Sequence, residues 1–431
     1  MQMPRWGSTP TDGYDTTDYK APVTLSGTTT ASASTSVFKE PKSSTLFYRV
    51  SLIVTTLGLY AVFVNMFTTP STDVDLSQYT DSIFIPFIYK FSTKHDPQVL
   101  CTVDGVNIKM PVDTGSTGLL IGAPILPNVS PIIGTPAHHF FTSSRILYVG
   151  RLVSLSIGFH GEAGSYATAT VPIFIVDKSW RCPWYNPSKD RFDCPLGPNG
   201  EKAIERDTSR ITYMGVGFGR NGARDGMPFA APKVNAFLNI DMIDGSPVSK
   251  TSMRAGYVMS KEGVHLGLTP KNMQGFTLTG LEPGLTHAED PRDWAMARMC
   301  FSINDDGINC GPALIDSGIP QMYIRTGGAA SIPTVVIRNP NKNGHAKFVK
   351  RVKPGTKITV GFPTLDAPVS YSFIVGENSS IEPSYVVPGN ASPPFVNTGR
   401  NFLFGYSIMF DAIGGRFGFH PANSLSSSAL L

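Results

Sequence analysis

Hydrophobic and polar positions alternate in short segments over most of the chain after residue 80. These segments are rich in Val, Ile, Thr, Phe and Tyr, and the clearest are 83–91, 99–103, 108–112, 147–159 and 167–176. A period of two places one face of a strand in a core and the other in solvent. Strong helical stretches are few, and residues 288–299 are expected to form a short helix or an edge segment. The pattern predicts an all-β domain.

The N-terminal part follows a different pattern. Residues 1–45 are rich in Ser, Thr, Pro, Gly and Asp without apolar periodicity, which predicts a disordered cytosolic tail. Eighteen residues from Val50 to Phe67 then carry no charge, and with the preceding residues they predict a transmembrane signal anchor over 46–67. Residues 68–80 would form a stalk.

Charges flanking the apolar stretch predict its orientation. Lys39, Lys42 and Arg49 precede it, and the positive side of a membrane segment stays in the cytosol. We therefore expect a single-pass type II membrane protein of the secretory pathway or cell surface, with a lumenal or extracellular C-terminal domain. Two alternatives remain, a cleavable signal peptide with an unusually long leader and a buried core helix.

Composition sets the size and excludes one class of partner. The 431 residues are sufficient for two lobes, which we expect at 81–270 and 271–421, followed by a disordered tail at 422–431. Only 16% of residues are charged, and a net charge of +4 is too small and scattered to indicate nucleic acid. The basic stretch 338–357 is interpreted as the solvated face of a hairpin.

The five cysteines fit an oxidising compartment. Cys300 and Cys310 flank a turn, and Cys182 and Cys194 bracket a loop, so two disulfides are expected and Cys101 is left over. Zinc is the competing explanation, but the chain has no Cys-x-x-Cys or Cys–His spacing to support it. Acceptor sequences for N-glycosylation follow the apolar stretch at Asn128, Asn378 and Asn390.

One short motif occurs twice. Asp113 ends an apolar run and is followed by Thr114, Gly115 and Ser116, and 203 residues later (316 − 113) Asp316 is followed by Ser317 and Gly318 after a similar run. Two turns of unrelated function would also use these residue types. Two copies in matching apolar surroundings instead favour a paired site.

Paired carboxyls explain the residue types of the motif. Two buried carboxyls in contact share one proton, so that one acts as base and the other as acid. Such a pair activates a water and protonates an amide without metal or cofactor. Glycine after each acid allows a tight turn and close approach, and the hydroxyls of Thr114 and Ser317 are expected to bond across to the opposite backbone.

These residues resemble the pepsin-like, two-lobed aspartic endopeptidases. The similarity extends over most of 81–421 and is clearest at the two motifs, at Tyr213 to Gly217, and at the C-terminal segment from Gly399 to Phe419, where Gly414-Gly415 is expected to form a hairpin turn. The resemblance implies one catalytic aspartate per lobe, Asp113 and Asp316. It also implies a peptide substrate bound in an extended conformation.

A flap tyrosine is also implied by the resemblance. Tyr148, with Gly150 after it, lies 35 residues beyond Asp113 (148 − 113) and is the best candidate, although an ordinary sheet tyrosine is the alternative. Ser116 would support Asp113.

The chain departs from the family pattern at several positions. The pair Leu119-Leu120 stands where many members carry tryptophan, Ile319 replaces a hydroxyl residue that commonly bonds the second aspartate, and Arg400 occupies an often acidic position. Loss of that hydroxyl should make Asp316 harder to ionise. A basic inhibitory pro-segment does not fit between the apolar stretch and the first strand.

The leading hypothesis is therefore a membrane-anchored aspartic endopeptidase, expected to be a monomer. Asp113 and Asp316 would share a proton, with Thr114, Gly115, Ser116, Ser317 and Gly318 supporting them. No metal or organic cofactor is implied. The alternative is a catalytically inactive pepsin-like protein that acts as a binding or structural module.

Overall fold

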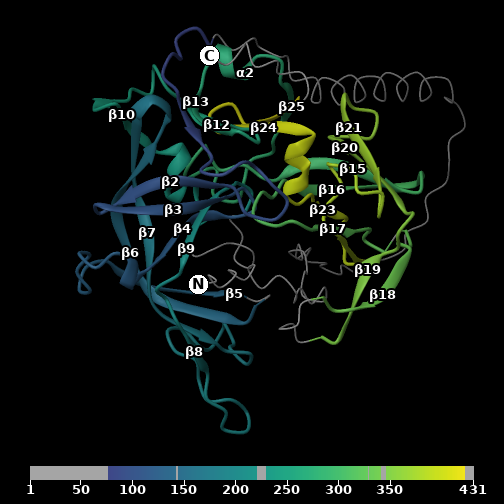
Figure 1. Ribbon diagram of the computed structural model, residues 1–431, viewed down its shortest axis with the longest axis horizontal. Coiled ribbons are helices and arrows are strands. Elements are labelled where there is room, and N and C mark those ends of the chain that lie inside the picture. Colours follow the sequence, from purple (N-terminus) through teal and green to yellow (C-terminus); the bar gives the residue numbers. More distant parts are fainter. Residues whose placement is uncertain (1–75, 142–143, 221–229, 329, 341–345, 423–431) are drawn as a thin grey trace, which may run out of the picture. The chain divides into compact units, whose positions relative to one another are not determined.

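The structure, a computed structural model, describes residues 76–431 except 142–143, 221–229, 329, 341–345 and 423–431 (Figure 1). The described residues from Ser77 onward belong to one compact unit. The expected tail, the anchor at 46–67 and the first part of the stalk lie outside the described residues, as does most of the C-terminal tail. No helix among the residues that are described has the length and apolar character needed to cross a bilayer.

The first lobe contains a ten-stranded sheet, counted within the described part of the chain. Its strands in spatial order are β11 (Ser246–Pro247), β10 (Ile240–Ile243), β7 (Tyr166–Arg181), β4 (Thr117–Gly122), β9 (Thr212–Val216), β3 (Val106–Asp113), β2 (Gln98–Val103), β6 (Ile146–His160) and β5 (Thr135–Phe141), with β8 (Ile204–Arg206) paired to β7. The long strands β6 and β7 also pair with each other. They contain the predicted segments 147–159 and 167–176, so those two predictions are confirmed.

The second lobe repeats this plan on a smaller scale. Its main sheet has seven strands among the described residues, in spatial order β21 (Val369–Ile374), β20 (Lys357–Phe362), β15 (Ala297–Ile303), β16 (Asp306–Leu314), β23 (Phe395–Asn397), β17 (Met322–Arg325) and β22 (Val386–Gly389). Part of the basic stretch lies on a separate hairpin of β18 (Thr334–Arg338) and β19 (Phe348–Val352). Lys350 is exposed there, as expected, whereas Arg351 is buried. Figure 1 shows the ten-stranded sheet in purple to teal and the seven-stranded sheet in green to yellow.

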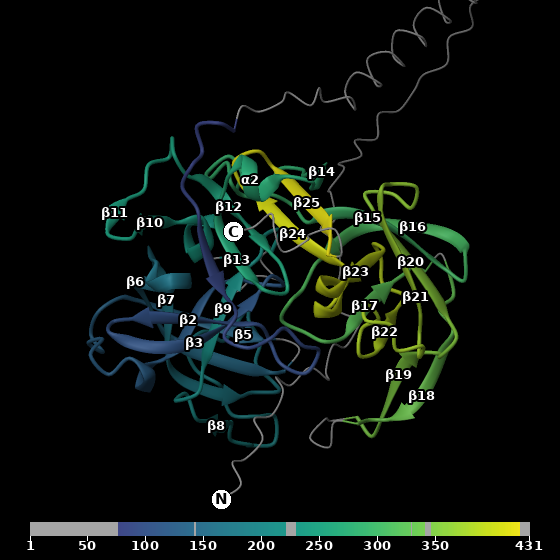
Figure 2. The same cartoon turned by 45° about the horizontal axis from the view of Figure 1, so that its top comes forward.

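A six-stranded sheet joins the two lobes. Its order among the described strands is β1 (Ile83–Pro86), β13 (Gly263–Leu268), β12 (Arg254–Met259), β24 (Tyr406–Asp411), β25 (Arg416–Pro421) and β14 (Thr277–Gly280). The central strands β12 and β24 lie side by side (Figure 2). They are antiparallel, with Gly256 opposite Asp411. The predicted boundary at residue 270 therefore falls beside a shared sheet and not in a linker between separate domains.

Helices are short throughout the described residues. They are the 3₁₀ turns η1 (Ala123–Ile125), η2 (Glu162–Gly164), η3 (Pro232–Val234), η4 (Ala236–Leu238) and η5 (Arg400–Phe404), and the single α-helical turn α2 (Pro270–Met273). The all-β prediction is confirmed for the described part of the chain.

The expectation for residues 288–299 is wrong. The segment up to residue 296 forms turns with one bridge between Pro283 and Trp294, and the strand β15 then begins and pairs on both sides. Two features close this loop and prevent a helix. Pro291 lacks an amide donor, and the Asp293 carboxylate accepts bonds from the amide and hydroxyl of Thr286 at 2.7 and 2.9 Å.

Both expected disulfides are present. Cys182 is bonded to Cys194, and Cys300 is bonded to Cys310 across the antiparallel strands β15 and β16. Cys101 is a buried free thiol on β2. Gly414 and Gly415 lie in the turn between β24 and β25, as predicted.

Candidate active site

The two aspartates emerge from the same local topology in each lobe. Strand β3 pairs in parallel with β9, which pairs antiparallel with β4, and Asp113 ends β3. In the second lobe β16 pairs in parallel with β23, which pairs antiparallel with β17, and Asp316 follows β16 by two residues. The repeated motif therefore marks a repeated unit of structure.

Side-chain hydroxyls cross-link the two loops. Thr114 Oγ1 donates to the carbonyl of Ile315, and Ser317 Oγ donates to the carbonyl of Val112, each at 2.7 Å. The amide of Thr114 donates to Ser317 Oγ and the amide of Ser317 donates to Thr114 Oγ1, each at 3.0 Å. Both side chains are buried, so this symmetric set of bonds fixes one loop against the other.

Each glycine lies directly against the aspartate of the other lobe. A Cβ atom on Gly115 would lie 2.3 Å from Cγ of Asp316, and one on Gly318 would lie 2.5 Å from Oδ1 of Asp113. Their amides donate to the aspartate of their own loop, at 2.7 Å to Asp113 Oδ1 and 2.9 Å to Asp316 Oδ1. Only glycine allows the two carboxyls to approach in this way.

Two side chains donate hydrogen bonds to the same carboxylate oxygen of Asp113, Oδ2. Ser116 Oγ donates to Oδ2 at 2.6 Å, and the hydroxyl of Tyr213 on β9 donates to the same oxygen. The Tyr213 hydroxyl also lies 2.7 Å from Ser116 Oγ. Burial, together with the Asp113 carboxylate, holds the pKa of Tyr213 well above its ordinary value, so this hydroxyl remains a donor.

Asp316 is bonded by an amide side chain. Asn397 Nδ2 on β23 donates to Asp316 Oδ2 at 2.7 Å, while the amide of Gly399 donates to Asn397 Oδ1 at 3.0 Å. Burial first, and then the charge of Asp113, raise the pKa of Asp316 to about 7. The protonated form of Asp316 is therefore favoured more than that of an exposed carboxyl.

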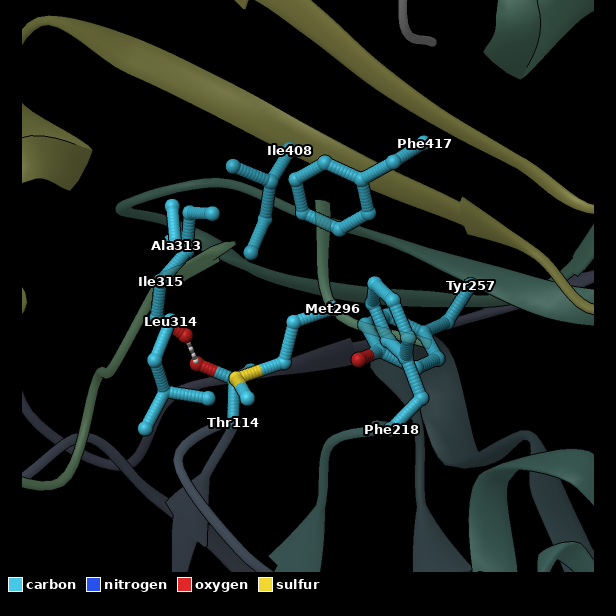
Figure 3. A pocket seen from close by; sticks show the side chains of 9 residues that line it. All are labelled: Thr114, Phe218, Tyr257, Met296, Ala313, Leu314, Ile315, Ile408 and Phe417. Atoms are coloured by element: carbon cyan, nitrogen blue, oxygen red, sulfur yellow. Dashed lines mark hydrogen bonds between the residues drawn. The ribbon is translucent and has the colours of Figure 1, made fainter. Parts of the chain in front are cut away.

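An apolar pocket lies behind the loops, on the side of the six-stranded sheet. Thr114 and Ile315 line it together with Phe218, Tyr257 and Met296, and Figure 3 shows the bond from the Thr114 hydroxyl inside this apolar setting. Hydrogen bonds in such a low-dielectric setting are strong, and breaking one is costly.

Arg400 has a structural role at the rim of the site. It is buried, forms an ion pair with Asp96, and donates to the carbonyl of Gly318 at 3.0 Å. Burial raises the pKa of Asp96 even though Arg400 opposes the shift. The basic residue in this position therefore ties the loop of the second aspartate to the first lobe.

The flap candidates lie inside the sheet. Tyr148 on β6 pairs with His139 of β5 on one side and Ser179 of β7 on the other. A Cβ on Gly150 would lie 1.9 Å from the carbonyl of Ile175, so this glycine lets β6 and β7 approach. Tyr148 is therefore not on a free two-stranded hairpin, although its ring packs in the same apolar cluster as Tyr213.

Sequence reasoning missed Tyr213 and Asn397 as partners of the aspartates. The sequence marks Tyr213 only as the start of a glycine-containing element and gives no sign of Asn397. The signal for both is strand register, because Tyr213 lies two residues before Gly215 on β9 and Asn397 ends β23, two residues before Gly399, and both strands pass beside an aspartate loop. The acceptor asparagines Asn128, Asn378 and Asn390 are all exposed.

Comparison with known proteins identifies no sequence relative. The chain matches no protein-family profile and no curated protein. Among solved structures, an aspartic proteinase from Irpex lacteus aligns over 81% of this chain and 100% of its own length, with 11% identity and a TM-score of 0.44. Basic 7S globulin from soybean aligns over 82% and 99%, with 12% identity and a TM-score of 0.44. These values assign no activity to the chain.

Proposed function

We propose that this chain is an aspartic endopeptidase, which hydrolyses peptide bonds with a water activated between Asp113 and Asp316. The observation that carries the proposal is the pair of buried carboxyls presented by equivalent loops, each packed against the glycine of the other. Asp316 has a raised pKa of about 7, which separates the acid of the pair from the base.

The reaction needs only these two groups and a water. The Asp113 carboxylate takes a proton from the water as its oxygen attacks the peptide carbonyl carbon, and Asp316 gives its proton to the carbonyl oxygen. The resulting diol collapses as the carbon–nitrogen bond breaks. The proton on Asp113 then moves to the leaving nitrogen, and Asp316 regains a proton from a diol hydroxyl, which restores the starting state.

The substrate is a peptide in an extended conformation, because strand-like peptides pair with backbone groups at the edges of β-structure. We further propose that the protein is monomeric and that residues 46–67 anchor it in a membrane of the secretory pathway as a type II protein. Two disulfides and three exposed acceptor asparagines support a lumenal or extracellular site domain. Resistance to alkaline extraction and sensitivity to a glycosidase that removes N-linked sugars would test this topology.

The activity is tested with the full chain made in a secretory host. The protein is incubated with an unfolded protein substrate over a range of pH, and cleavage is compared between wild type and Asp113→Asn. The matched control is Asp104→Asn, at an exposed turn residue with φ of 49°, where asparagine is well accommodated. Loss of cleavage only in Asp113→Asn supports the assigned pair, and equal cleavage in all three proteins refutes it.

A second candidate is a catalytically inactive binding protein. It is favoured by the Tyr213 hydroxyl, which occupies one oxygen of Asp113, and by the apolar residues Leu120 and Ile319 at positions where the resembled family carries polar or indole groups. A statine-type inhibitor separates the two candidates, because its hydroxyl requires a competent carboxyl pair. Inhibitor binding with inhibitable cleavage favours the enzyme, and a folded protein that neither binds it nor cleaves favours the second candidate.

A further inference from the structure

Tyr213 and Asn397 occupy the same place in the two lobes. Tyr213 lies opposite Leu120 in the β4–β9 pairing, and Asn397 lies opposite Tyr323 in the β17–β23 pairing. Leu120 is seven residues after Asp113 (120 − 113), and Tyr323 is seven residues after Asp316 (323 − 316). Each lobe therefore supplies one polar side chain to its aspartate from an equivalent strand position.

The two side chains are held in place by different means. The ring of Tyr213 packs in an apolar cluster with Leu120 and Tyr148, which fixes the direction of its hydroxyl. The amide of Asn397 is oriented by Gly399, whose N–H can only donate and so must face Oδ1. Asn397 Nδ2 is consequently the atom that faces Asp316.

We propose that Tyr213 and Asn397 are paired positioning residues that separately set the two ionisation steps of the aspartate pair. This inference rests on the proposed function and identifies how the pH range of that site is controlled. The first step removes a proton from the pair and leaves the charge on Asp113, where the Tyr213 hydroxyl stabilises it. The second step ionises Asp316, where the Asn397 amide stabilises the new charge.

Other titratable groups face the pair from several elements. Asp96 lies in the segment before β2, where its ion pair with Arg400 of η5 balances it, and Tyr257 projects from β12. Burial is the main cause of the raised pKa of both Asp96 and Tyr257, and the charge of Asp113 adds to it in each case. Tyr213→Phe keeps all of these groups in the chain and removes one hydroxyl, which donates to Asp113 Oδ2 and also lies 2.7 Å from Ser116 Oγ.

The test follows the titration of the pair directly. The full chain is labelled with ¹³Cγ-aspartate, and carboxyl resonances are recorded against pH for wild type, Tyr213→Phe, and Asn397→Leu. We expect Tyr213→Phe to raise the lower midpoint of the pair by about one to two pH units and leave the upper midpoint unchanged. Asn397→Leu should raise the upper midpoint and leave the lower one unchanged.

Tyr371→Phe is the matched control. Tyr371 is a buried tyrosine of the second lobe whose hydroxyl has no hydrogen-bond partner among the described residues, so both midpoints should stay at their wild-type values. Unchanged midpoints in Tyr213→Phe, or equal movement of both midpoints in each variant, would overturn the inference.

Measurement of kcat/KM against pH adds a second readout. In an active protein the acidic limb should move upward in Tyr213→Phe and the basic limb upward in Asn397→Leu, while KM changes little. If wild type cleaves no substrate at any pH, the proposed function fails, and the carboxyl titration still decides whether the two residues control the pair.

Discussion

The hydroxyl cross-links between the two aspartate loops lead to a quantitative prediction. Thr114→Val keeps the shape of the side chain but leaves the carbonyl of Ile315 and the amide of Ser317 without their bonds. Ser317→Ala does the same to the carbonyl of Val112 and the amide of Thr114. Because each unpaired buried group costs about 1–3 kcal/mol, each substitution leaves two such groups and should lower the free energy of unfolding by roughly 2–6 kcal/mol.

The two substitutions should also be strongly coupled. The two side chains also bond each other, with Thr114 Oγ1 3.3 Å from Ser317 Oγ, so either substitution removes this shared bond. The double variant should therefore cost less than the sum of the two single variants, by about 0.5–3 kcal/mol. Equilibrium urea unfolding of the four proteins, followed by tryptophan fluorescence, measures both quantities.

A matched pair of hydroxyls provides the control. Thr359 and Ser372 bond each other at 2.8 Å across β20 and β21 on an exposed face, where water replaces the lost partner. Thr359→Val and Ser372→Ala should each change the free energy of unfolding by less than about 0.5 kcal/mol. If Thr114→Val and Ser317→Ala cost no more than these controls, or show no coupling, the cross-links do not hold the loops together.

Three further predictions concern the pH dependence, the close approach of the loops and a disulfide. The pKa of Asp316 is about 7 in the folded protein and about 4 in the unfolded chain, so its stabilising contribution is full below pH 4 and is lost as the pH rises to 7. Asp316→Asn should reduce this loss, by up to roughly 4 kcal/mol in the free energy of unfolding, and the thermal midpoint measured against pH should therefore decline less than in wild type. An unchanged decline of the thermal midpoint would exclude the assignment. Gly318→Ala should lower kcat about 100-fold, whereas Gly280→Ala, which has open space around it, should not change it in the same cleavage assay. Replacing Cys300 and Cys310 by serine should lower the free energy of unfolding by about 2–3 kcal/mol, as measured by urea unfolding.

The part of the site that is formed by residues close together in the sequence could be predicted. The motif from Asp113 to Ser116 contains its own turn glycine and its own hydroxyl donors, so the roles of these residues could be predicted from the sequence. The disulfides could be paired because each joins cysteines only 10 or 12 residues apart. Alternation of apolar residues likewise located the two longest described strands, β6 and β7, because burial of one face is a property of the strand itself.

The part of the site that could not be predicted depends on pairing between residues far apart in the sequence. Tyr213 is 100 residues from Asp113, and Asn397 is 81 residues from Asp316, so only the parallel register of β9 and β23 brings them to the carboxyls. The pairing of β12 with β24, which joins the two lobes, could not be predicted from the sequence for the same reason. The sequence shows that Arg400 departs from the pattern of the resembled family. Its ion pair with Asp96 joins residues 304 positions apart, so only the folded structure reveals it.

The backbones of the two aspartate loops are equivalent, whereas the side chains around the two aspartates differ. Position three after each aspartate is Ser116 in the first lobe and Ile319 in the second, so only Asp113 gains a hydroxyl donor from its own loop. Asn397 supplies Asp316 with one donor from a strand, yet burial and the neighbouring charge still raise its pKa to about 7. Two identical carboxyls on equivalent loops therefore have different hydrogen-bond donors, and the difference lies in a few side chains and not in the main-chain frame that presents the carboxyls.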